Sequence, residues 1–125
     1  MGAQENKETV RRYFEGRFND KDYSVVDQYL APDAVPTPDQ QKAWLDEFHA
    51  AWGDAHCTLD HLIAEDDLVA VHWTIESTFQ GAWDGHAPTG KRLQVSGMAL
   101  CWLRDGMLVK DDVGYHNLDE VLRDG

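Results

Sequence analysis

The sequence predicts an α+β fold in which helices pack on one face of a curved antiparallel sheet. Apolar side chains recur at helical spacing through the first half of the chain and alternate with polar ones through the second half. Short turns rich in Asp and Gly separate the alternating runs. Because these runs follow one another through such turns, we expect consecutive strands to pair antiparallel.

Three helices are expected in the first half of the chain. Residues 5–18 place Val10, Tyr13, Phe14, Arg17 and Phe18 on one face of a helix. A short second helix follows Asp22, which is a suitable N-cap. The segment "TPDQ" at 37–40 combines a capping box with Pro at the first helical position. It starts a third helix that ends at Gly53 and has an apolar side made of Trp44, Leu45, Phe48 and Trp52.

Four strands are expected after Gly53, at about 55–64, 68–80, 93–103 and 107–116. Asp105-Gly106 is typical of a type I′ hairpin turn between the last two. Asn117 with Glu120 can then cap a short C-terminal helix.

The strand at 93–103 is largely apolar on both faces toward its C-terminal end, so both faces need cover. We expect the face with Gly97, Ala99 and Cys101 to meet the helices, where small residues leave space. The face with Met98, Leu100 and Trp102 then needs a second subunit, which predicts a homodimer.

Composition and charge exclude several classes of function. A chain of 125 residues is expected to form one domain over 1–125, and its net charge of −12 argues against nucleic-acid and anionic-membrane partners. No apolar run is long enough to span a membrane, and the N-terminus does not resemble a secretory signal. Cys57 and Cys101 are expected to be free thiols, so we expect a cytoplasmic protein.

Four segments resemble, in family order, the SnoaL-like polyketide cyclases: "VRRYFEGRFNDKD", "YLAPDAV", "LIAEDDLVAVHWT" and "APTGKRLQVSGMALCWLRDGMLV". The resemblance extends to the wider fold of nuclear transport factor, ketosteroid isomerase and limonene epoxide hydrolase. It implies a six-stranded curved sheet wrapped around the N-terminal helices into a cone with one central pocket. It also implies a sheet-to-sheet homodimer and, in catalytic members, acid/base side chains that work without metal or organic cofactor.

Two features depart from the family pattern. After "APDAV" the chain runs directly into "PTPDQQ", which shortens the strand expected there. Val113 stands where relatives commonly carry a carboxylate in the last strand. These departures keep open whether the mechanism of the cyclases or epoxide hydrolases transfers to this chain.

An apolar pocket for a hydrophobic small molecule is expected between the helices and the inward face of the sheet. Ordinary core packing is the alternative for each aromatic side chain. The residues expected to contact the ligand are Tyr13, Phe14, Tyr29, Trp44, Phe48, Trp73, Ile75, Val95, Gly97, Ala99 and Val113.

Asp111 is the main candidate for acid/base catalysis. Alternation places it with Val109 and Val113 on the inward face, where an apolar environment raises a carboxyl pKa toward the working range. The alternative is a solvated patch around Lys110, with Asp112 as the inward residue if the phase is reversed.

Two further residues are expected to assist. His61 falls in the inward set of its strand and could pair with Asp111 or orient a carbonyl, although a histidine at the rim without a role is the alternative. Tyr115 could donate a hydrogen bond to a ligand oxygen, or simply pack with its hydroxyl in water.

The six histidines show no spacing typical of a zinc site, and no phosphate-binding loop or hydrolytic Ser-His-Asp set is evident. The leading hypothesis is therefore a cofactor-independent acid/base enzyme of cyclase, isomerase or epoxide-hydrolase type that acts on a hydrophobic, oxygenated small molecule. A non-catalytic binding or accessory protein of the same fold is the alternative. A protein-interaction module that uses the outer sheet face is a third possibility.

Overall fold

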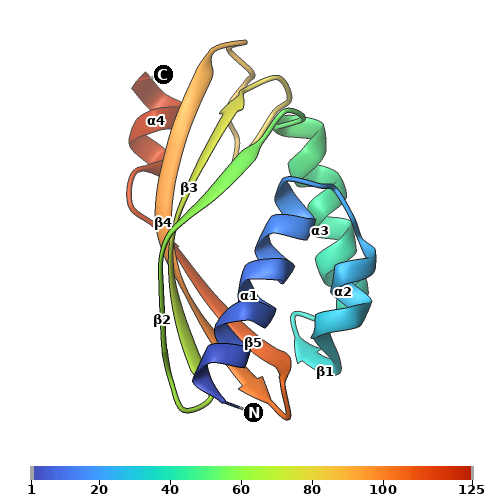
Figure 1. Cartoon of the computed structure of the whole chain (residues 1–125). Coiled ribbons are helices and arrows are strands. Elements are labelled where there is room, and N and C mark those ends of the chain that lie inside the picture. The colour runs from blue at the N-terminus through green and yellow to red at the C-terminus, as the bar shows by residue number, and fades with distance from the viewer. Residues whose placement is uncertain (1, 125) are drawn as a thin grey trace.

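The computed structural model describes residues 2–124, in which one curved sheet carries three helices on one face (Figure 1). The strand order is β1-β5-β4-β3-β2. This arrangement confirms the α+β fold with helices on one side of a curved sheet. The elements are α1 (Ala3–Phe18), α2 (Ser24–Tyr29), β1 (Leu30–Val35), α3 (Pro38–Ala51), β2 (His56–Glu65), β3 (Leu68–Thr78), β4 (Arg92–Arg104), β5 (Met107–Tyr115) and α4 (Leu118–Asp124).

The sheet departs from the sequence expectation in two ways. Within residues 2–124 it has five strands, whereas the family resemblance implied six. Only Pro36 and Thr37 separate β1 from α3, so the chain has no room there for a further strand. In addition, β1 pairs parallel with β5, while the other neighbouring strands pair antiparallel.

The start of α3 follows its sequence signature. Gln40 N donates to the Thr37 hydroxyl at 3.2 Å, and Thr37 N donates to the Gln40 side-chain carbonyl at 3.0 Å, which completes the capping box. The start of α2 differs by one residue. Tyr23 occupies the N-cap, while the Asp22 carboxylate accepts the Ser24 N–H at 3.0 Å from one position earlier.

Two β-bulges set which side chains face the helices. The register of β2 with β3 shifts between Leu59 and His61, so Asp60 is the extra residue. The register of β4 with β5 shifts between Trp102 and Leu103, so Val109 is the extra residue in β5. Leu108, rather than Val109, is therefore the residue that lies in the core. Because this second bulge lies before Asp111, the predicted inward phase of residues 111–115 survives it.

Gly97 in β4 does not leave empty space, contrary to the expectation from the small residues in this strand. A Cβ added there would lie 2.6 Å from Cζ2 of the Trp73 ring and against the carbonyl oxygen of Gly114. The indole of Trp73 therefore occupies the place that the missing side chain vacates. Ala99 and Cys101, further along β4, are buried in the core.

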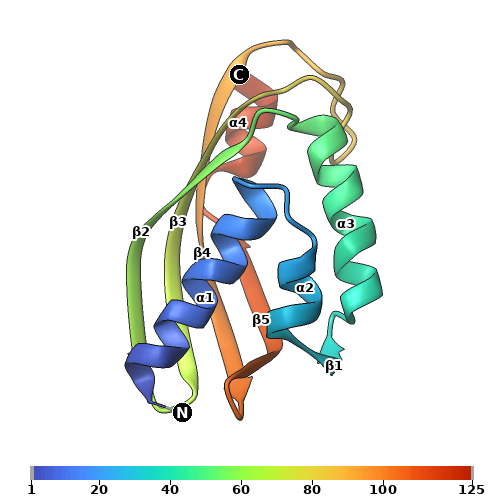
Figure 2. The ribbon, with the colours of Figure 1, turned by 45° about the vertical axis from the view of Figure 1, so that its right-hand side comes forward.

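The helix α4 lies beside β4 at the upper end of the sheet (Figure 2). Asn117 precedes it as expected, but its side chain binds the sheet. The Asn117 side-chain carbonyl accepts the Ser96 N–H at 2.9 Å, and its amide donates to the Gln94 carbonyl at 3.3 Å. The predicted side-chain cap of Asn117 is therefore wrong, because both of its groups bond to β4.

Cys57 in β2 and Cys101 in β4 are free and buried. Burial in this layer raises the pKa of each thiol to about 12. Both side chains therefore remain protonated at neutral pH. None of the helices within residues 2–124 is long and apolar enough to cross a membrane.

Asp54, after the end of α3, accepts three hydrogen bonds from the end of β3 and one from the start of β4. Its carboxylate accepts the Thr78 N–H at 2.7 Å, both the Ser77 and Thr78 hydroxyls at 2.8 Å, and Arg92 Nη1 at 3.1 Å. These donors, the Thr78 backbone first, hold the pKa of Asp54 below its usual range. The carboxylate thus stabilises the fold only while it is ionised.

We expect Asp54→Asn to lower the free energy of unfolding by about 1 kcal/mol at pH 7, a value reduced because the side chain is half exposed. The pKa is lower in the folded state, so the loss is fully present above the ordinary Asp pKa of about 4 and disappears as the pH falls toward the folded value. Urea denaturation of both proteins across this range measures it.

The matched control is Asp33→Asn, which removes an exposed ion pair to Arg104 with an N–O distance of 2.7 Å. Exposed pairs contribute little to stability, so this variant should be nearly neutral. Equal losses in the two variants would contradict a special role for Asp54.

Candidate active site

A cavity of about 500 Å³ lies between the helices and the sheet. Helices α1 and α3 wall one side, strands β3, β4 and β5 wall the other, and the loop at 79–91 and α4 contribute to one end. Most of the lining is apolar or aromatic, as expected for a ligand pocket. The lining residues are Phe14, Arg17, Phe18, Pro36, Gln40, Gln41, Trp44, Phe48, Trp52, Trp73, Ile75, Ser77, Trp83, Leu93, Val95, Asp111, Val113, Tyr115 and Leu118.

The structure brings most of the predicted ligand-contacting residues to this cavity. Alternation in β3, β4 and β5 and the apolar sides of α1 and α3 place them there. They are Phe14, Trp44, Phe48, Trp73, Ile75, Val95 and Val113, together with the acid/base candidate Asp111 and the expected hydrogen-bond donor Tyr115.

Four predicted contacts lie elsewhere. Tyr13 is buried beneath the guanidinium of Arg17, which lies 4.0 Å from its ring centre. The hydroxyl of Tyr29 accepts a hydrogen bond from its neighbour Gln28 at 3.2 Å, at the exposed end of α2. Gly97 is covered by the Trp73 ring, and Ala99 is buried in the core beyond it.

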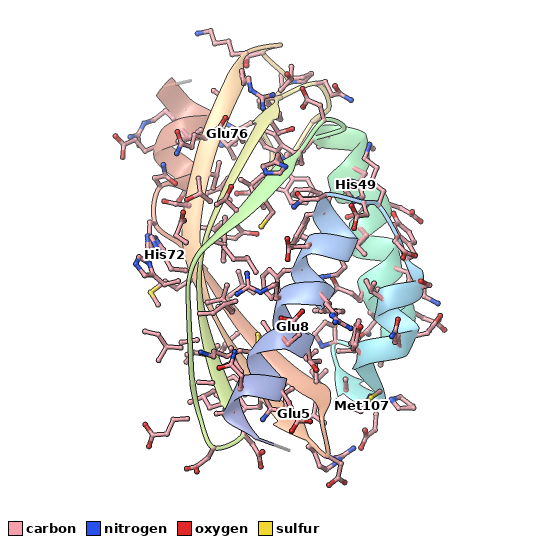
Figure 3. All side chains as sticks on the ribbon, viewed as in Figure 1. Glu5, Glu8, His49, His72, Glu76 and Met107 are labelled. Atoms are coloured by element: carbon pink, nitrogen blue, oxygen red, sulfur yellow. The ribbon has the colours of Figure 1, made fainter. Side chains whose placement is uncertain are left out.

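His61 faces away from the cavity, so the expectation that it points inward was wrong. The bulge at Asp60 reverses the alternation of β2 and places His61 opposite His72 on the outer sheet face. The two Nδ1 atoms lie 3.2 Å apart, and the rings stack. Figure 3 shows His72 projecting from the sheet on the side away from the helices. His61 therefore cannot pair with Asp111 across the cavity.

Asp111 lies on the cavity wall opposite Cys101 in the β4–β5 ladder. Burial raises its pKa above the ordinary carboxyl value, Arg17 opposes this rise, and the neighbouring Asp112 adds to it. Asp112 itself pairs with Leu100 and is exposed, so the reversed phase does not occur. The site thus holds a carboxyl group suited to exchange protons with a ligand.

Tyr115 stands further along the same strand, toward the end of the cavity. Its ring packs edge-on against Trp73 with ring centres 5.5 Å apart. The side chain keeps 45% of its surface exposed, and burial of the remainder raises the pKa of its hydroxyl. The phenol therefore stays protonated and can donate a hydrogen bond near the cavity entrance.

Arg17 is the main site residue that sequence reasoning did not select. It is only 3% exposed. Its Nε donates to the Tyr13 carbonyl at 3.3 Å, and its Nη1 donates to the Gln41 side-chain carbonyl at 2.6 Å. The guanidinium also lies within 5 Å of the ring centres of Phe14 and Phe18. The sequence contained one signal for this role, because Arg17 is a charged residue within the apolar stripe of α1.

The loop at 79–91 supplies an aromatic residue that the strand pattern did not predict. Trp83 packs edge-on against Trp44 and Phe48, with ring centres 6.0 and 5.9 Å apart. The isolated Trp in the Gly-rich segment "GAWDGHAPTG" was the signal for this contact. Ser77 also lines the cavity wall, but its hydroxyl is bound to Asp54.

No cluster of three or more His, Cys, Asp or Glu side chains that could hold a metal ion occurs within residues 2–124. The ionisable groups that the cavity itself offers are Asp111, Arg17 and Tyr115. Proton exchange and hydrogen bonding are the chemistry that these side chains can perform.

The profile of the SnoaL-like domain matches residues 10–110, which runs from within α1 to the first part of β5. The matched range includes Arg17 and ends one residue before Asp111. The chain belongs to the SnoaL-like family. No functionally curated protein matches this SnoaL-like chain. The match to the family profile confirms the resemblance seen in the sequence.

Solved structures show the same fold. TsrD from Streptomyces laurentii has 19% identity and a TM-score of 0.88, with 98% of this chain and 97% of that chain covered. A proposed SnoaL-like polyketide cyclase from Jannaschia sp. CCS1 has 20% identity and a TM-score of 0.86, covering 96% and 92%. AclR, a proposed hydroxylase from Streptomyces galilaeus, has 23% identity and a TM-score of 0.83, covering 98% and 82%. At these identities the likeness establishes the cone-shaped fold of this SnoaL-like chain.

Proposed function

We propose that this SnoaL-like chain is a cofactor-independent acid/base enzyme that transfers a proton on an apolar, oxygen-containing small molecule. The observation that carries the proposal is Asp111, a carboxyl group on the wall of an apolar cavity whose burial raises its pKa. A base of this kind can remove a proton from a carbon next to a carbonyl group and return it elsewhere. Isomerisation and aldol closure both begin with that step.

The position of the carboxylate within β5 sets this chain apart from the family pattern. Relatives commonly place it where Val113 stands, whereas Asp111 lies on the same face two residues earlier. Two residues of strand correspond to about 7 Å. The reacting carbon should therefore lie closer to α1 and Arg17 than in relatives with the carboxylate at the usual place, while Tyr115 remains near the entrance.

Deuterium exchange tests the proposal directly. 2-Tetralone is a bicyclic ketone of suitable size with acidic protons beside its carbonyl group. Incubation in D₂O, followed by proton NMR, should show loss of the α-proton signal that depends on enzyme concentration. A panel of bicyclic ketones that bind in the cavity but show no exchange above the buffer rate would overturn the enzymatic proposal.

A non-catalytic ligand-binding protein is the second candidate, and Val113 favours it, because the chain lacks a carboxylate at the position where catalytic relatives commonly have one. Both candidates predict binding, which should quench the fluorescence of Trp44 and Trp73 in the cavity wall. Only the enzyme predicts exchange, so binding without exchange decides for the second candidate. Two buried free thiols support a reducing compartment such as the cytoplasm for either candidate.

We also propose a homodimer through the outer face of the sheet. Met98 and Leu100 are 44% and 38% exposed there, and Trp102 is half-buried with Lys110 Nζ 5.0 Å from its ring centre. A second copy would remove this apolar surface from water, and a stable interface would bury more than about 1,000 Å². Sedimentation at micromolar concentration should therefore give twice the mass of one chain.

The variant Leu100→Glu places a charge in the proposed interface and should give a folded monomer. Val35→Glu, at an apolar side chain that is 67% exposed at the edge strand β1, is the matched control and should leave the dimer intact. A monomeric wild-type protein at micromolar concentration contradicts this assembly.

A further inference from the structure

Arg17 carries a buried positive charge without an ion pair. Among residues 2–124 no carboxylate oxygen lies within 4.0 Å of its guanidinium nitrogens. Its two hydrogen bonds, to the Tyr13 carbonyl and to Gln41, use two of its five N–H groups. Burying a charge is costly unless something compensates it. The remaining donors belong to a side chain that lines the cavity and is 97% buried, since its exposure is 3%.

The cavity places Arg17 and Asp111 on opposite layers of the molecule. Arg17 comes from α1 in the helical layer, and Asp111 comes from β5 in the sheet. They are not in ionic contact, and Arg17 is the main group that counteracts the rise in the pKa of Asp111. Both side chains line the same cavity, so one ligand in it can contact both.

The entrance indicates the charge of that ligand. A second, adjoining hollow shares Trp44, Trp83, Tyr115 and Leu118 with the cavity, and we take it as the entrance. Its rim carries four carboxylates, one arginine and one histidine, namely Glu47, Asp84, Asp119, Glu120, Arg123 and His116. Together with a chain charge of −12, this rim disfavours the entry of anions. The buried charge of Arg17 in turn disfavours a cation in the cavity, so the ligand should enter as a neutral molecule.

We propose that Arg17 binds the carbonyl oxygen of a neutral ketone with an apolar ring frame and stabilises the enolate that forms on that oxygen. This inference rests on the proposed function and adds the substrate class and the residue that recognises it. Asp111 accepts the proton of the α-carbon, the C–H electron pair forms the carbon–carbon double bond, and the carbonyl π pair moves to the oxygen beside Arg17. When the enolate collapses, the carbonyl group forms again and one of two steps follows. In an isomerisation a carbon of the enolate system takes the proton back from Asp111. In an aldol closure the α-carbon attacks a second carbonyl carbon, and the oxygen of that carbonyl takes the proton from Asp111.

Gln41 has a positioning role in this scheme. It is 6% exposed, and its side-chain carbonyl accepts the 2.6 Å hydrogen bond from Arg17 Nη1. Together with the aromatic rings of Tyr13, Phe14 and Phe18, it holds the planar guanidinium in one orientation. Donors held in place before the reaction stabilise developing charge most effectively.

Ligand pairs that differ in one oxygen test the binding part without any turnover. 2-Tetralone and its hydrocarbon isostere, in which a methylidene group replaces the carbonyl oxygen, have nearly the same shape. Calorimetric titration of wild-type protein should show tighter binding of the ketone by about 10- to 100-fold, the range for a hydrogen bond to a charged group. In Arg17→Met this preference should disappear, while the affinity for the hydrocarbon stays within about twofold of wild type.

Arg11→Met is the matched control, since Arg11 lies on the exposed side of the same helix and pairs with Glu8. It should keep the full ketone preference. Arg17→Lys should retain part of it, and Gln41→Leu should reduce it severalfold, so the inference can be tested even if Arg17→Met does not fold. Equal preference in wild type, Arg17→Lys and Gln41→Leu would overturn the inference, as would a wild-type protein that binds neither probe.

The pH profile of exchange separates charge stabilisation from packing. Arg17 lowers the pKa of Asp111, so its replacement should move the acidic limb of the rate profile to higher pH and reduce the rate at its plateau. An unchanged profile in Arg17→Met would contradict the enolate role. If wild type shows no exchange but its ketone preference depends on Arg17, the enzymatic proposal fails and the carbonyl site stands. If exchange occurs but the preference does not depend on Arg17, the carbonyl site fails alone.

Discussion

Asp111→Asn is expected to lower the rate of α-proton exchange by about 10²- to 10⁴-fold, the usual contribution of a general base. The amide has nearly the same shape as the carboxyl group but cannot accept the proton. In the wild type, the rate should rise with pH through a midpoint above the ordinary carboxyl range, because burial raises the pKa of Asp111 and only its ionised form is a base. Proton NMR in D₂O across pH 3–9 measures both effects.

Asp112→Asn is the matched control, because Asp112 lies next in the chain but faces the outer side opposite Leu100. It should keep the wild-type rate. Asp111→Asn should also unfold at the same or a higher denaturant concentration at pH 7. The folded state raises this pKa, so ionisation of Asp111 costs stability above the folded value and the amide avoids that cost. Loss of exchange in Asp112→Asn with full activity in Asp111→Asn would contradict the assignment.

Gly97→Ala is expected to lower the free energy of unfolding by about 1–3 kcal/mol, the range for overpacking a filled core. The added methyl group would meet Cζ2 of Trp73 at 2.6 Å and the backbone carbonyl of Gly114 still closer. The carbonyl belongs to the β4–β5 ladder and cannot move aside cheaply. The indole, which lines the cavity, has to shift as well. Urea denaturation measures the stability, and tetralone titration measures the narrowed cavity.

Gly114→Ala provides the control on the neighbouring strand. A Cβ at Gly114 meets no heavy atom within 4 Å. The substitution should therefore be neutral or stabilising by a few tenths of a kcal/mol, since Ala restricts the unfolded chain. If the two alanine variants lose the same stability, the contact between Trp73 and Gly97 is not the cause.

Alternation predicted the fold and the inward direction of Asp111 but not the outward direction of His61, and the two bulges explain this difference. A count by twos along β5 reaches Asp111 correctly because the bulge at Val109 precedes it. The same count along β2 assigns His61 to the wrong face because the bulge at Asp60 lies between it and Leu59. A bulge depends on how two strands pair, which a single strand's sequence does not contain.

The sequence pattern also could not predict residues whose place at the cavity depends on contacts with distant parts of the chain. Arg17 falls on the apolar stripe of α1, but its contact with Gln41, 24 positions later, and its place on the cavity wall depend on how α1 and α3 pack. Trp83 lies in a loop, where no periodicity predicts a direction, and its place follows from contacts with α3. Aromatic residues on regular elements, such as Phe48 and Trp73, were predicted because a helix or strand fixes their direction.

The two buried thiols can report how often the structure opens locally. Cys57 and Cys101 are 3% and 0% exposed, and burial raises the pKa of each thiol to about 12. In the closed structure an alkylating reagent therefore cannot reach either sulfur, and neither sulfur is present as the reactive thiolate. Modification can then proceed only from open states, and its rate measures how often β2 and β4 become accessible. A ligand that bridges helices and sheet should slow the labelling of both cysteines by the same factor, if the two layers separate as one unit.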